Sequence, residues 1–306
     1  ILLLSWRDSE GHRKFPMSAT VRFPVRFFFF RTTIVLTETG PVYSGNFLPD
    51  ALGGKGKYMA IFTISDLHLP LSAPEKTMEV FSGWTDYVRR LEENWRRLVS
   101  PEDTVVVGGD ISWAMQLERA EADFRFLDSL PGRKLLMKGN HDYWWSTRKK
   151  MEAFFASKGL TTLEILHNNA VEAEGLALCG SRGWIFENGA AADQLVIERE
   201  AGRIRMSLEA APEGLERILF LHYPPVYCGQ QIPAYLNLMK EFGVRRCYYG
   251  HLHGPSVANA YVGDFDGIAL RLVSADYLRF CPMLVPSQGQ EDEKRGKNAS
   301  GNAQNQ

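Results

Sequence analysis

The sequence predicts an α/β domain whose functional groups lie along the carboxyl edge of a largely parallel sheet. From Met59 onward, short apolar runs rich in β-branched residues alternate with longer amphipathic stretches. This order is typical of buried parallel strands joined by crossover helices. Strongly polar clusters directly follow several of the apolar runs, and ligands bind at that edge of open α/β sheets.

The first half of the domain is predicted to hold three strand–helix units. Each unit starts with a short, mostly apolar run of four or five residues and continues with apolar residues at helical spacing. In the first helix, Trp84, Val88, Leu91 and Trp95 share one face. The predicted strands are 60–64, 104–107 and 134–137, and the helices that follow them are 75–99, 116–130 and 146–158.

The second half is predicted to be more antiparallel. Its Gly-Asp-Phe-Asp-Gly segment contains an Asp-Gly pair, which favours a hairpin turn, so Asp264 and Asp266 are predicted to be turn residues rather than metal ligands. The predicted strands are 163–173, 176–180, 217–221, 245–249 and 267–274, and the predicted helices are 191–209 and 232–242.

Three regions of the chain differ in character. Residues 1–58 show neither helical nor strand periodicity and are predicted to be an upstream extension that is not native or is poorly ordered. The glycines and lysines of 53–57 would be encoded by purine-rich codons, as a translated ribosome-binding site would be, which favours a start at Met59 over a genuine extension. Residues 59–285 form the predicted catalytic domain. The polar tail 286–306 is predicted to be disordered.

Composition restricts the class of protein. The 306 residues include 35 basic and 36 acidic ones, which argues against nucleic acid as a partner, although a nuclease with one basic groove is compatible with it. The four cysteines have no spacing typical of a disulfide framework or of structural zinc, which indicates a reducing cytoplasm. No apolar run is long enough to cross a bilayer. A soluble cytoplasmic protein is therefore predicted, with its oligomeric state open.

The polar clusters combine residue types that bind transition metals. Carboxylate oxygens together with neutral imidazoles suit Mn²⁺, Fe, Zn²⁺ or Co²⁺ rather than an all-oxygen Mg²⁺ or Ca²⁺ cage. Mn²⁺ is the expected metal, with Fe, Zn²⁺, Co²⁺ or Ni²⁺ as alternatives. Alternate residues of an extended segment point the same way, so both polar side chains of an Asp-x-His or His-x-His block are expected to face one site. In chain order the blocks are Asp66-Leu67-His68, Gly109-Asp110, Gly139-Asn140-His141-Asp142, His222 and Gly250-His251-Leu252-His253.

These blocks resemble the signature of the calcineurin-like metallophosphoesterases, which reads DxH, GD, GNH(D/E), H and GHxH in that order. The resemblance covers the chain from Asp66 to His253. It implies a four-layer α/β/β/α sandwich of two mixed β-sheets flanked by helices, the metallo-dependent phosphatase fold. The GD block continues as Ile-Ser-Trp rather than the Asp-Arg-Gly typical of protein phosphatases, and the third block ends in Asp142 rather than Glu. The chain is therefore more similar to the prokaryotic small phosphohydrolases.

The resemblance also implies a dinuclear metal centre. His141 would be the general acid or a donor to a phosphoryl oxygen, and Asp142 would orient its ring. The implied ligands are Asp66, His68 and His253 for the first ion, Asn140, His222 and His251 for the second, and Asp110 as the bridge between them.

Such a centre supports hydrolysis of phosphoesters. Two cations about 3.5–4 Å apart can activate a shared water and neutralise charge on the phosphoryl oxygens, and a protonated histidine can assist the leaving group. A small phosphodiester is the preferred substrate class, with a phosphomonoester as the alternative. A catalytically inactive scaffold is the alternative from another class of protein, but all the signature positions are filled here.

Three residues are candidates for contact with the substrate. Trp113 and Tyr143 follow ligand blocks, so they either stack on an aromatic group of the substrate or pack against the sheet. Arg182 follows another predicted strand and forms either a phosphate contact or a surface salt bridge. His167 is predicted to be a turn residue. Both interpretations stay open for each of the three candidates.

Overall fold

The computed structural model describes residues 33–37, 40–44, 59–186 and 190–287, and side chains within 59–186 and 193–287. In the upstream region it describes one antiparallel hairpin of β1 (Thr33–Thr37) and β2 (Gly40–Ser44), where the sequence shows no strand periodicity. The other expectations for 1–58 and those for residues 288–306 lie outside the described residues. The domain boundaries therefore stay predictions.

The first sheet has five strands in the order β15-β3-β4-β5-β6. The last four of these run parallel to one another, and β15 is antiparallel to β3. The strands β3 and β4 are buried along their whole length, which suits their β-branched composition. The strands are β3 (Ile61–Ile64), β4 (Thr104–Val107), β5 (Arg133–Leu136), β6 (Leu163–Ile165) and β15 (Met283–Val285).

The second sheet has six strands in the order β13-β14-β12-β9-β8-β7. The four central strands are parallel, and β7 and β13 at the edges are antiparallel. The strands are β7 (Asn169–Ala173), β8 (Leu176–Ser181), β9 (Glu216–Leu221), β12 (Arg246–Tyr249), β13 (Gly263–Phe265) and β14 (Ile268–Leu272). A separate short hairpin consists of β10 (Val226–Tyr227) and β11 (Gln230–Gln231).

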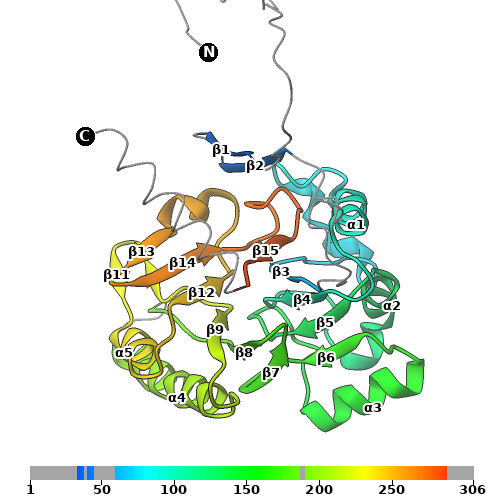
Figure 1. Ribbon diagram of the computed structural model, residues 1–306. Helices are drawn as coiled ribbons and strands as arrows, with labels where there is room; N and C mark the ends of the chain where they lie inside the picture. Colours follow the sequence, from blue (N-terminus) through cyan, green and yellow to red (C-terminus); the bar gives the residue numbers. More distant parts are fainter. Residues whose placement is uncertain (1–32, 38–39, 45–58, 187–189, 288–306) are drawn as a thin grey trace, which may run out of the picture.

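Helices cover the outer face of each sheet, so the predicted α/β/β/α architecture is confirmed. Figure 1 shows the two sheets between α1–α3 on one side and α4–α5 on the other. The helices are α1 (Tyr87–Leu98), α2 (Glu121–Ser129), α3 (Arg148–Lys158), α4 (Ala190–Glu209) and α5 (Pro233–Glu241). None of the helices in the described part of the chain is both long and apolar enough to span a bilayer.

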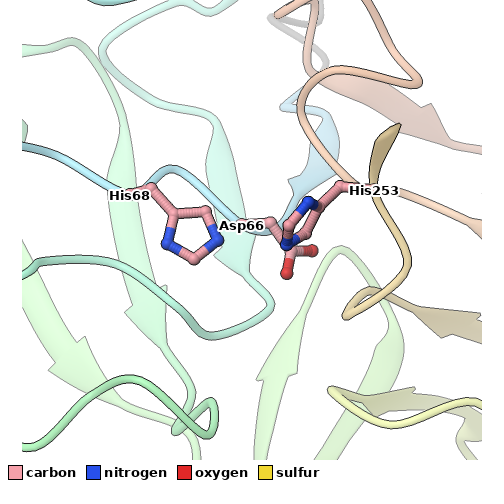
Figure 2. Close-up of side chains that lie close together, drawn as sticks. All are labelled: Asp66, His68 and His253. Atoms are coloured by element: carbon pink, nitrogen blue, oxygen red, sulfur yellow. The ribbon is translucent and has the colours of Figure 1, made fainter. Parts of the chain in front are cut away.

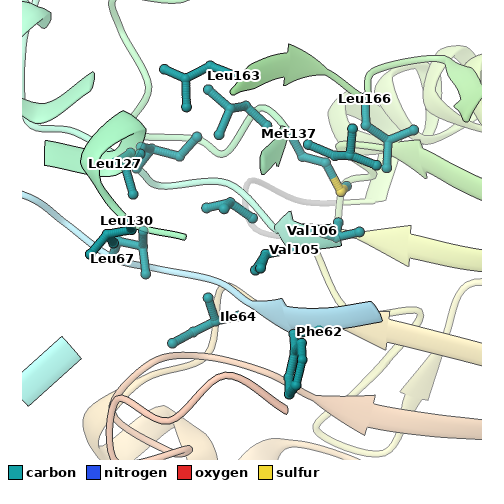
Figure 3. Packing of buried hydrophobic residues seen from close by; sticks show 14 of the residues in the cluster. Phe62, Ile64, Leu67, Val105, Val106, Leu127, Leu130, Met137, Leu163 and Leu166 are labelled. Carbon is teal, nitrogen blue, oxygen red and sulfur yellow. The ribbon is translucent and has the colours of Figure 1, made fainter. Parts of the chain in front are cut away.

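Alternate side chains of the second sheet point to its two opposite faces, and each face borders a different hydrophobic core. Leu178, Ile218 and Phe220 belong to the core shared with the first sheet, part of which is drawn in Figure 3. Their neighbours Cys179 and Leu219 belong instead to the core beneath α4 and α5. The layer between the two sheets is therefore a continuous hydrophobic core that holds their carboxyl edges at a fixed distance.

The structure differs from the predicted elements in several places. The predicted helix 75–99 begins only at Tyr87, because Gly83 (φ 89°) and Asp86 (φ 54°) adopt left-handed backbone conformations that interrupt a helix. The segment before it forms the 3₁₀ turns η2 (Pro74–Lys76) and η3 (Met78–Val80). The predicted strand 163–173 is two strands in different sheets, β6 and β7.

A further difference is β15, for which the sequence predicted no strand. Its three residues pair with β3 and become a strand only through that tertiary contact. The turn predicted at Asp264 and Asp266 is confirmed: it connects β13 to β14, and the Gly267 N–H donates to Asp264 Oδ1 at 3.0 Å.

The chain crosses from the first sheet to the second at Leu166–Asn168, and α4 is fastened there by Ser207. The Ser207 hydroxyl accepts from the Gly180 N–H at 2.9 Å and donates to the Asn169 carbonyl at 2.6 Å. Ser207 and Gly180 are both buried. One hydroxyl therefore joins α4 to β7 and β8 beside the sheet crossing.

Replacing Ser207 by Ala is expected to destabilise the fold. The buried Gly180 N–H would lose its acceptor, and an unsatisfied buried donor costs about 1–3 kcal/mol. Urea denaturation measures the free energy of unfolding. Ser157→Ala is the control, because that hydroxyl bonds within the exposed face of α3. Equal free energies of unfolding for the two variants would contradict the account.

Candidate metal centre

The five polar blocks meet at the carboxyl ends of β3, β4, β5, β9 and β12, which belong to both sheets. Each block follows its strand by no more than a few residues, so the parallel strands deliver all of them to the same edge. The structure thus brings together all seven predicted metal ligands and the predicted acid His141.

The first group is Asp66, His68 and His253. One ligand atom from each lies within 4.8 Å of the others. Figure 2 shows the three side chains close together, with the His253 ring overlapping the Asp66 carboxylate in this view and the His68 ring to their left. Asp66 and His68 are fully buried, and His253 is half-buried.

Asp110 lies between this group and the next. Its Oδ2 atom is 3.7 Å from Nε2 of His68 and 3.7 Å from Nε2 of His222. Ligand atoms of Asp66, Asp110 and His222 also lie within 4.8 Å of one another. One carboxylate is therefore equidistant from two histidines that come from opposite sheets, which is the position a bridging ligand requires.

The remaining predicted ligands converge on Asn140. Its Oδ1 atom is 2.7 Å from His222 Nε2 and 2.9 Å from His251 Nδ1. The Nδ1 atom of His222 is 3.1 Å from the Gly108 carbonyl. If that nitrogen carries the proton, the ring orientation leaves the Nε2 lone pair facing Asn140 and Asp110, as metal binding would need.

The backbone that carries these residues is strained rather than extended. Asp66 (φ 59°), His68 (φ 45°), Asp110 (φ 51°) and His251 (φ 69°) all adopt left-handed conformations, each at a cost of about 1–3 kcal/mol. The expectation that Asp66 and His68 share a face because their segment is extended is therefore wrong. The two side chains meet because the left-handed backbone at both residues directs them into the same site.

Glycines allow the loops to approach so closely. A Cβ atom on Gly139 would collide with the carboxylate and backbone nitrogen of Asp110, and one on Gly250 would collide with Ser65 and Asp66. Gly109 combines φ 100° with a position against Gly139. These loops therefore pack directly on the carboxylates that they surround.

The Asp142 carboxylate fastens two of the loops together. It accepts hydrogen bonds from the backbone N–H groups of Asp110 (2.9 Å), Ile111 (2.8 Å), Ser112 (3.4 Å) and Gly139 (2.7 Å). The Trp144 indole N–H donates to it as well, at 3.0 Å. Its predicted role in orienting the His141 ring stays a prediction, and the structure gives Asp142 this additional task.

The protonation states of the clustered side chains are those that metal binding needs. The pKa values of His68 and His222 lie well below the usual range, because of burial first and then the neighbouring histidines. Both are therefore neutral, as metal ligands must be. The Nε2 atom of His68 is buried and has no hydrogen-bond partner among the described residues. Burial, and then the Asp142 and Asp66 carboxylates, raise the pKa of Asp110 well above its usual value. The ionised Asp110 carboxylate is therefore unfavourable by itself, and bound cations would stabilise it. The residues fit two divalent ions.

The three candidate substrate contacts occupy different positions. Trp113 stacks on His68 with ring centroids 4.7 Å apart and lies 5.1 Å from the His141 ring. Tyr143 is exposed at the rim, 6.1 Å from His141. Arg182 pairs with Glu200 at 2.9 Å, and its carbonyl accepts from the His222 N–H at 3.1 Å. Contact of any of the three with substrate stays a prediction.

Two residues that contact the site were not predicted from the sequence to belong to it. Trp84, predicted only as part of a helix face, lies 6.0 Å from His68 and 6.1 Å from His253 between ring centroids. The Tyr87 hydroxyl donates to the His68 carbonyl at 2.6 Å. Both lie many residues from the nearest signature block, so no local pattern connects them to it.

An α/β/β/α sandwich with Asp, Asn and His side chains clustered at the edges of both sheets is the arrangement expected of a metal-dependent hydrolase. The family comparison is more specific. The model of the calcineurin-like phosphoesterases matches residues 59–255, and the chain belongs to this family. The protein is therefore a metal-dependent phosphoesterase, and the resemblance inferred from the sequence is confirmed.

Solved structures include several that are similar over most of their length. A protein of unknown function, AQ665 from Aquifex aeolicus, has a TM-score of 0.41 and 17% identity, covering 78% of this chain and 99% of its own. The phosphopantetheinyl hydrolase PptH from Mycobacterium tuberculosis has a TM-score of 0.46 and 15% identity, covering 75% and 96%. TT1561 of Thermus thermophilus has a TM-score of 0.41 and 15% identity, covering 64% and 82%. A comparison with curated proteins gives no significant match.

Replacing Gly139 by Ala is expected to weaken metal binding by at least about tenfold, or about 1.4 kcal/mol. The added methyl group would displace the Asp110 carboxylate from its position between His68 and His222. Metal content after equilibrium dialysis against Mn²⁺ measures the effect, with circular dichroism to verify folding.

The matched control is Gly202→Ala on α4, where a Cβ would contact nothing within 4 Å. It is expected to keep full metal content and to stabilise the helix slightly. A folded Gly139→Ala variant with unchanged metal affinity would show that the close packing of this loop is irrelevant to the centre.

Proposed function

We propose that this protein hydrolyses a small phosphodiester with two divalent metal ions held at the edges of its two sheets. The observation that carries the proposal is the position of Asp110, whose Oδ2 is 3.7 Å from both His68 Nε2 and His222 Nε2. A carboxylate equidistant from two neutral, buried imidazoles suits a dinuclear centre better than a mononuclear one.

The ligands would divide between the two ions as the family resemblance implies. We propose Mn²⁺ as the metal, and the donor set of carboxylates, imidazoles and one amide is also compatible with Fe, Zn²⁺, Co²⁺ or Ni²⁺. Asp110 would bridge the ions. Asp66, His68 and His253 would hold the first ion, and Asn140, His222 and His251 the second.

The chain's own residues would position the substrate and move the proton. When bound, the two ions supply activation of water and neutralisation of phosphoryl charge. The backbone N–H of His141 donates to Asp110 Oδ1 at 2.8 Å, which would fix the acid beside the proposed bridge. Its half-buried ring faces Trp113 and would donate a proton to the oxygen of the leaving group. Trp113, packed on both His68 and His141, would limit the rotation of both rings.

Other features favour a small substrate in the cytoplasm. The balanced charge of the chain argues against nucleic acid. The four cysteines are free, as is usual in a reducing compartment. A phosphomonoester remains the alternative substrate class. An inactive scaffold is the alternative from another class, and the complete set of converging ligands speaks against it, because the strained backbone would have no function without metal.

Metal-stripped protein supplied with Mn²⁺ is expected to cleave bis-p-nitrophenyl phosphate faster than p-nitrophenyl phosphate. Asp110→Ala removes the proposed bridge and should lower kcat/KM by at least about 10³-fold, because it removes a ligand of both ions. Asp264→Ala, an exposed turn carboxylate, is the matched control and should retain activity. Turnover of the monoester alone would support the phosphatase alternative, and inactivity on both esters with metal bound would contradict the proposed hydrolysis.

His141→Asn is expected to affect poor leaving groups most. On the methyl ester of thymidine 5′-phosphate, kcat should fall by about 10²–10⁴-fold, the usual contribution of a general acid. On the p-nitrophenyl ester the loss should be much smaller, since nitrophenolate leaves without a proton. Equal losses on the two esters would show that His141 binds the phosphoryl group instead of protonating the leaving group.

A further inference from the structure

The place where the chain crosses between the sheets also brings together the ends of β5 and β8. The Leu166 N–H donates to the Leu136 carbonyl at the end of β5, at 2.9 Å. Asn168 is bonded to the end of β8 twice, through the Gly180 carbonyl at 2.7 Å and the Ser181 hydroxyl at 2.9 Å. The residues that follow these strand ends are therefore neighbours in space although they are far apart in the sequence.

Two of those residues are basic, and α4 adds a third. Lys138 lies two positions beyond Leu136, and Arg182 directly follows Ser181. Ser207 fastens α4 to the same crossing, and Arg203 lies about one helical turn before it. We call Lys138, Arg182 and Arg203 the basic cluster.

Two carboxylates act on these three cations: Glu200 pairs with both arginines, and Asp142 acts electrostatically on Lys138. Glu200 is almost fully buried, and its Oε1 accepts from Arg182 Nη2 at 2.9 Å and from Arg203 Nη1 at 2.5 Å. The Arg182 guanidinium also lies over the Trp184 ring, 5.0 Å from its centroid. Glu200 therefore holds each guanidinium group in place through a single N–H contact. The other N–H donors of each guanidinium group are not used by Glu200, so they can bond to a further acceptor.

The positive charge of the basic cluster exceeds its internal compensation. Arg182 Nε is buried and has no acceptor among the described residues, and within the same part of the chain the Lys138 ammonium group has no hydrogen bond or ion pair. The pKa of His167, which lies at the crossing, is lowered to about 3 by burial first and then by Lys138, Arg203 and Arg182. Like charges held together in this way are unfavourable unless an anion joins them.

The basic cluster adjoins the side of the metal centre that belongs to the second ion. Lys138 is followed directly by Gly139 and Asn140. The Arg182 carbonyl accepts from the N–H groups of His222 at 3.1 Å and Tyr223 at 2.9 Å. Two residues of the basic cluster are therefore joined through the backbone to segments that carry predicted ligands of the second ion, and Lys138 interacts electrostatically with Asp142.

We infer that the basic cluster is a subsite for a second phosphate group, so that the substrate is a phosphoester with a further phosphate beyond the scissile one. The two guanidinium forks match phosphate oxygens geometrically, and the lysine adds a compact charge. The subsite deepens the proposed function and rests on it for the scissile bond. Binding of the second phosphate needs no metal ion, because the chain itself supplies the cations.

The test compares two substrates that differ by one phosphate group. They are thymidine 5′-(p-nitrophenyl phosphate) and the same ester with a 3′-phosphate, each turned over by the full-length Mn²⁺-loaded enzyme. The 3′-phosphate is expected to raise kcat/KM by about tenfold. The effect should appear mainly as a lower KM, because charge-assisted hydrogen bonds to the basic cluster would strengthen binding of the substrate. Lys138→Met and Arg203→Met should each bring the ratio of the two kcat/KM values close to one.

The ratio is measured within each variant, so a general loss of active protein cancels. Arg199→Met is the matched control, because Arg199 is exposed on α4 one turn before Arg203, and it should leave the ratio unchanged. A wild-type ratio near one overturns the inference, as does a ratio that survives both substitutions in the basic cluster.

A second measurement separates the subsite from the chemistry. Inorganic phosphate is titrated calorimetrically into the metal-stripped protein and into its Lys138→Met and Arg199→Met variants. Binding that is lost only in Lys138→Met supports the subsite even if neither ester is hydrolysed, in which case the proposed phosphodiesterase activity alone fails. Absence of phosphate binding, or binding equal in all three proteins, overturns the subsite whether or not the esters are cleaved.

Discussion

The geometry of the metal centre depends on one buried carboxylate, that of Asp142. It gathers the backbone N–H groups of Asp110, Ile111, Ser112 and Gly139 around two oxygen atoms. These groups belong to two loops that follow β4 and β5, and such charge-assisted bonds are stronger than ordinary ones. Because Asp110 and Asn140 are carried on the joined loops, the proposed bridge and one proposed ligand of the second ion keep a fixed separation. The carboxylate thus determines the spacing of the metal centre without contributing to the ligand set.

The strained ligand loops are held by the sheets on which they stand. Left-handed backbone at Asp66, His68, Asp110 and His251 persists only where the surroundings determine it. Here the strands before the loops are buried and parallel, and the apolar layer between the sheets fixes one carboxyl edge against the other. The proposed ligands come from both edges, so the packing between the sheets sets the distances between the two halves of the centre.

The sequence predicted most of what depends on local pattern and little of what depends on tertiary contact. The ligand blocks could be found because each one directly follows an apolar run, and their order matches one family. By contrast, β15 is a strand only because β3 is beside it. The turn predicted at His167 marks the break between β6 and β7, but no local pattern tells that the two strands belong to different sheets. The strained backbone at Asp66 and His68 gave no local signal, since L-residues rarely adopt it. Trp84 and Tyr87 reach the site from a segment that only the fold places there.

The same distinction explains why the basic cluster was not visible in the sequence. Lys138, Arg182 and Arg203 lie on β5, β8 and α4 or shortly after them, and no spacing connects them. Together with the metal centre they create two sources of positive charge side by side. One source depends on bound ions, because the chain there supplies carboxylates and neutral imidazoles. The other is built from fixed side chains around Glu200. A substrate that carries two phosphate groups would meet a cationic partner for each, whereas a substrate with a single phosphoester would leave the excess charge of the basic cluster uncompensated.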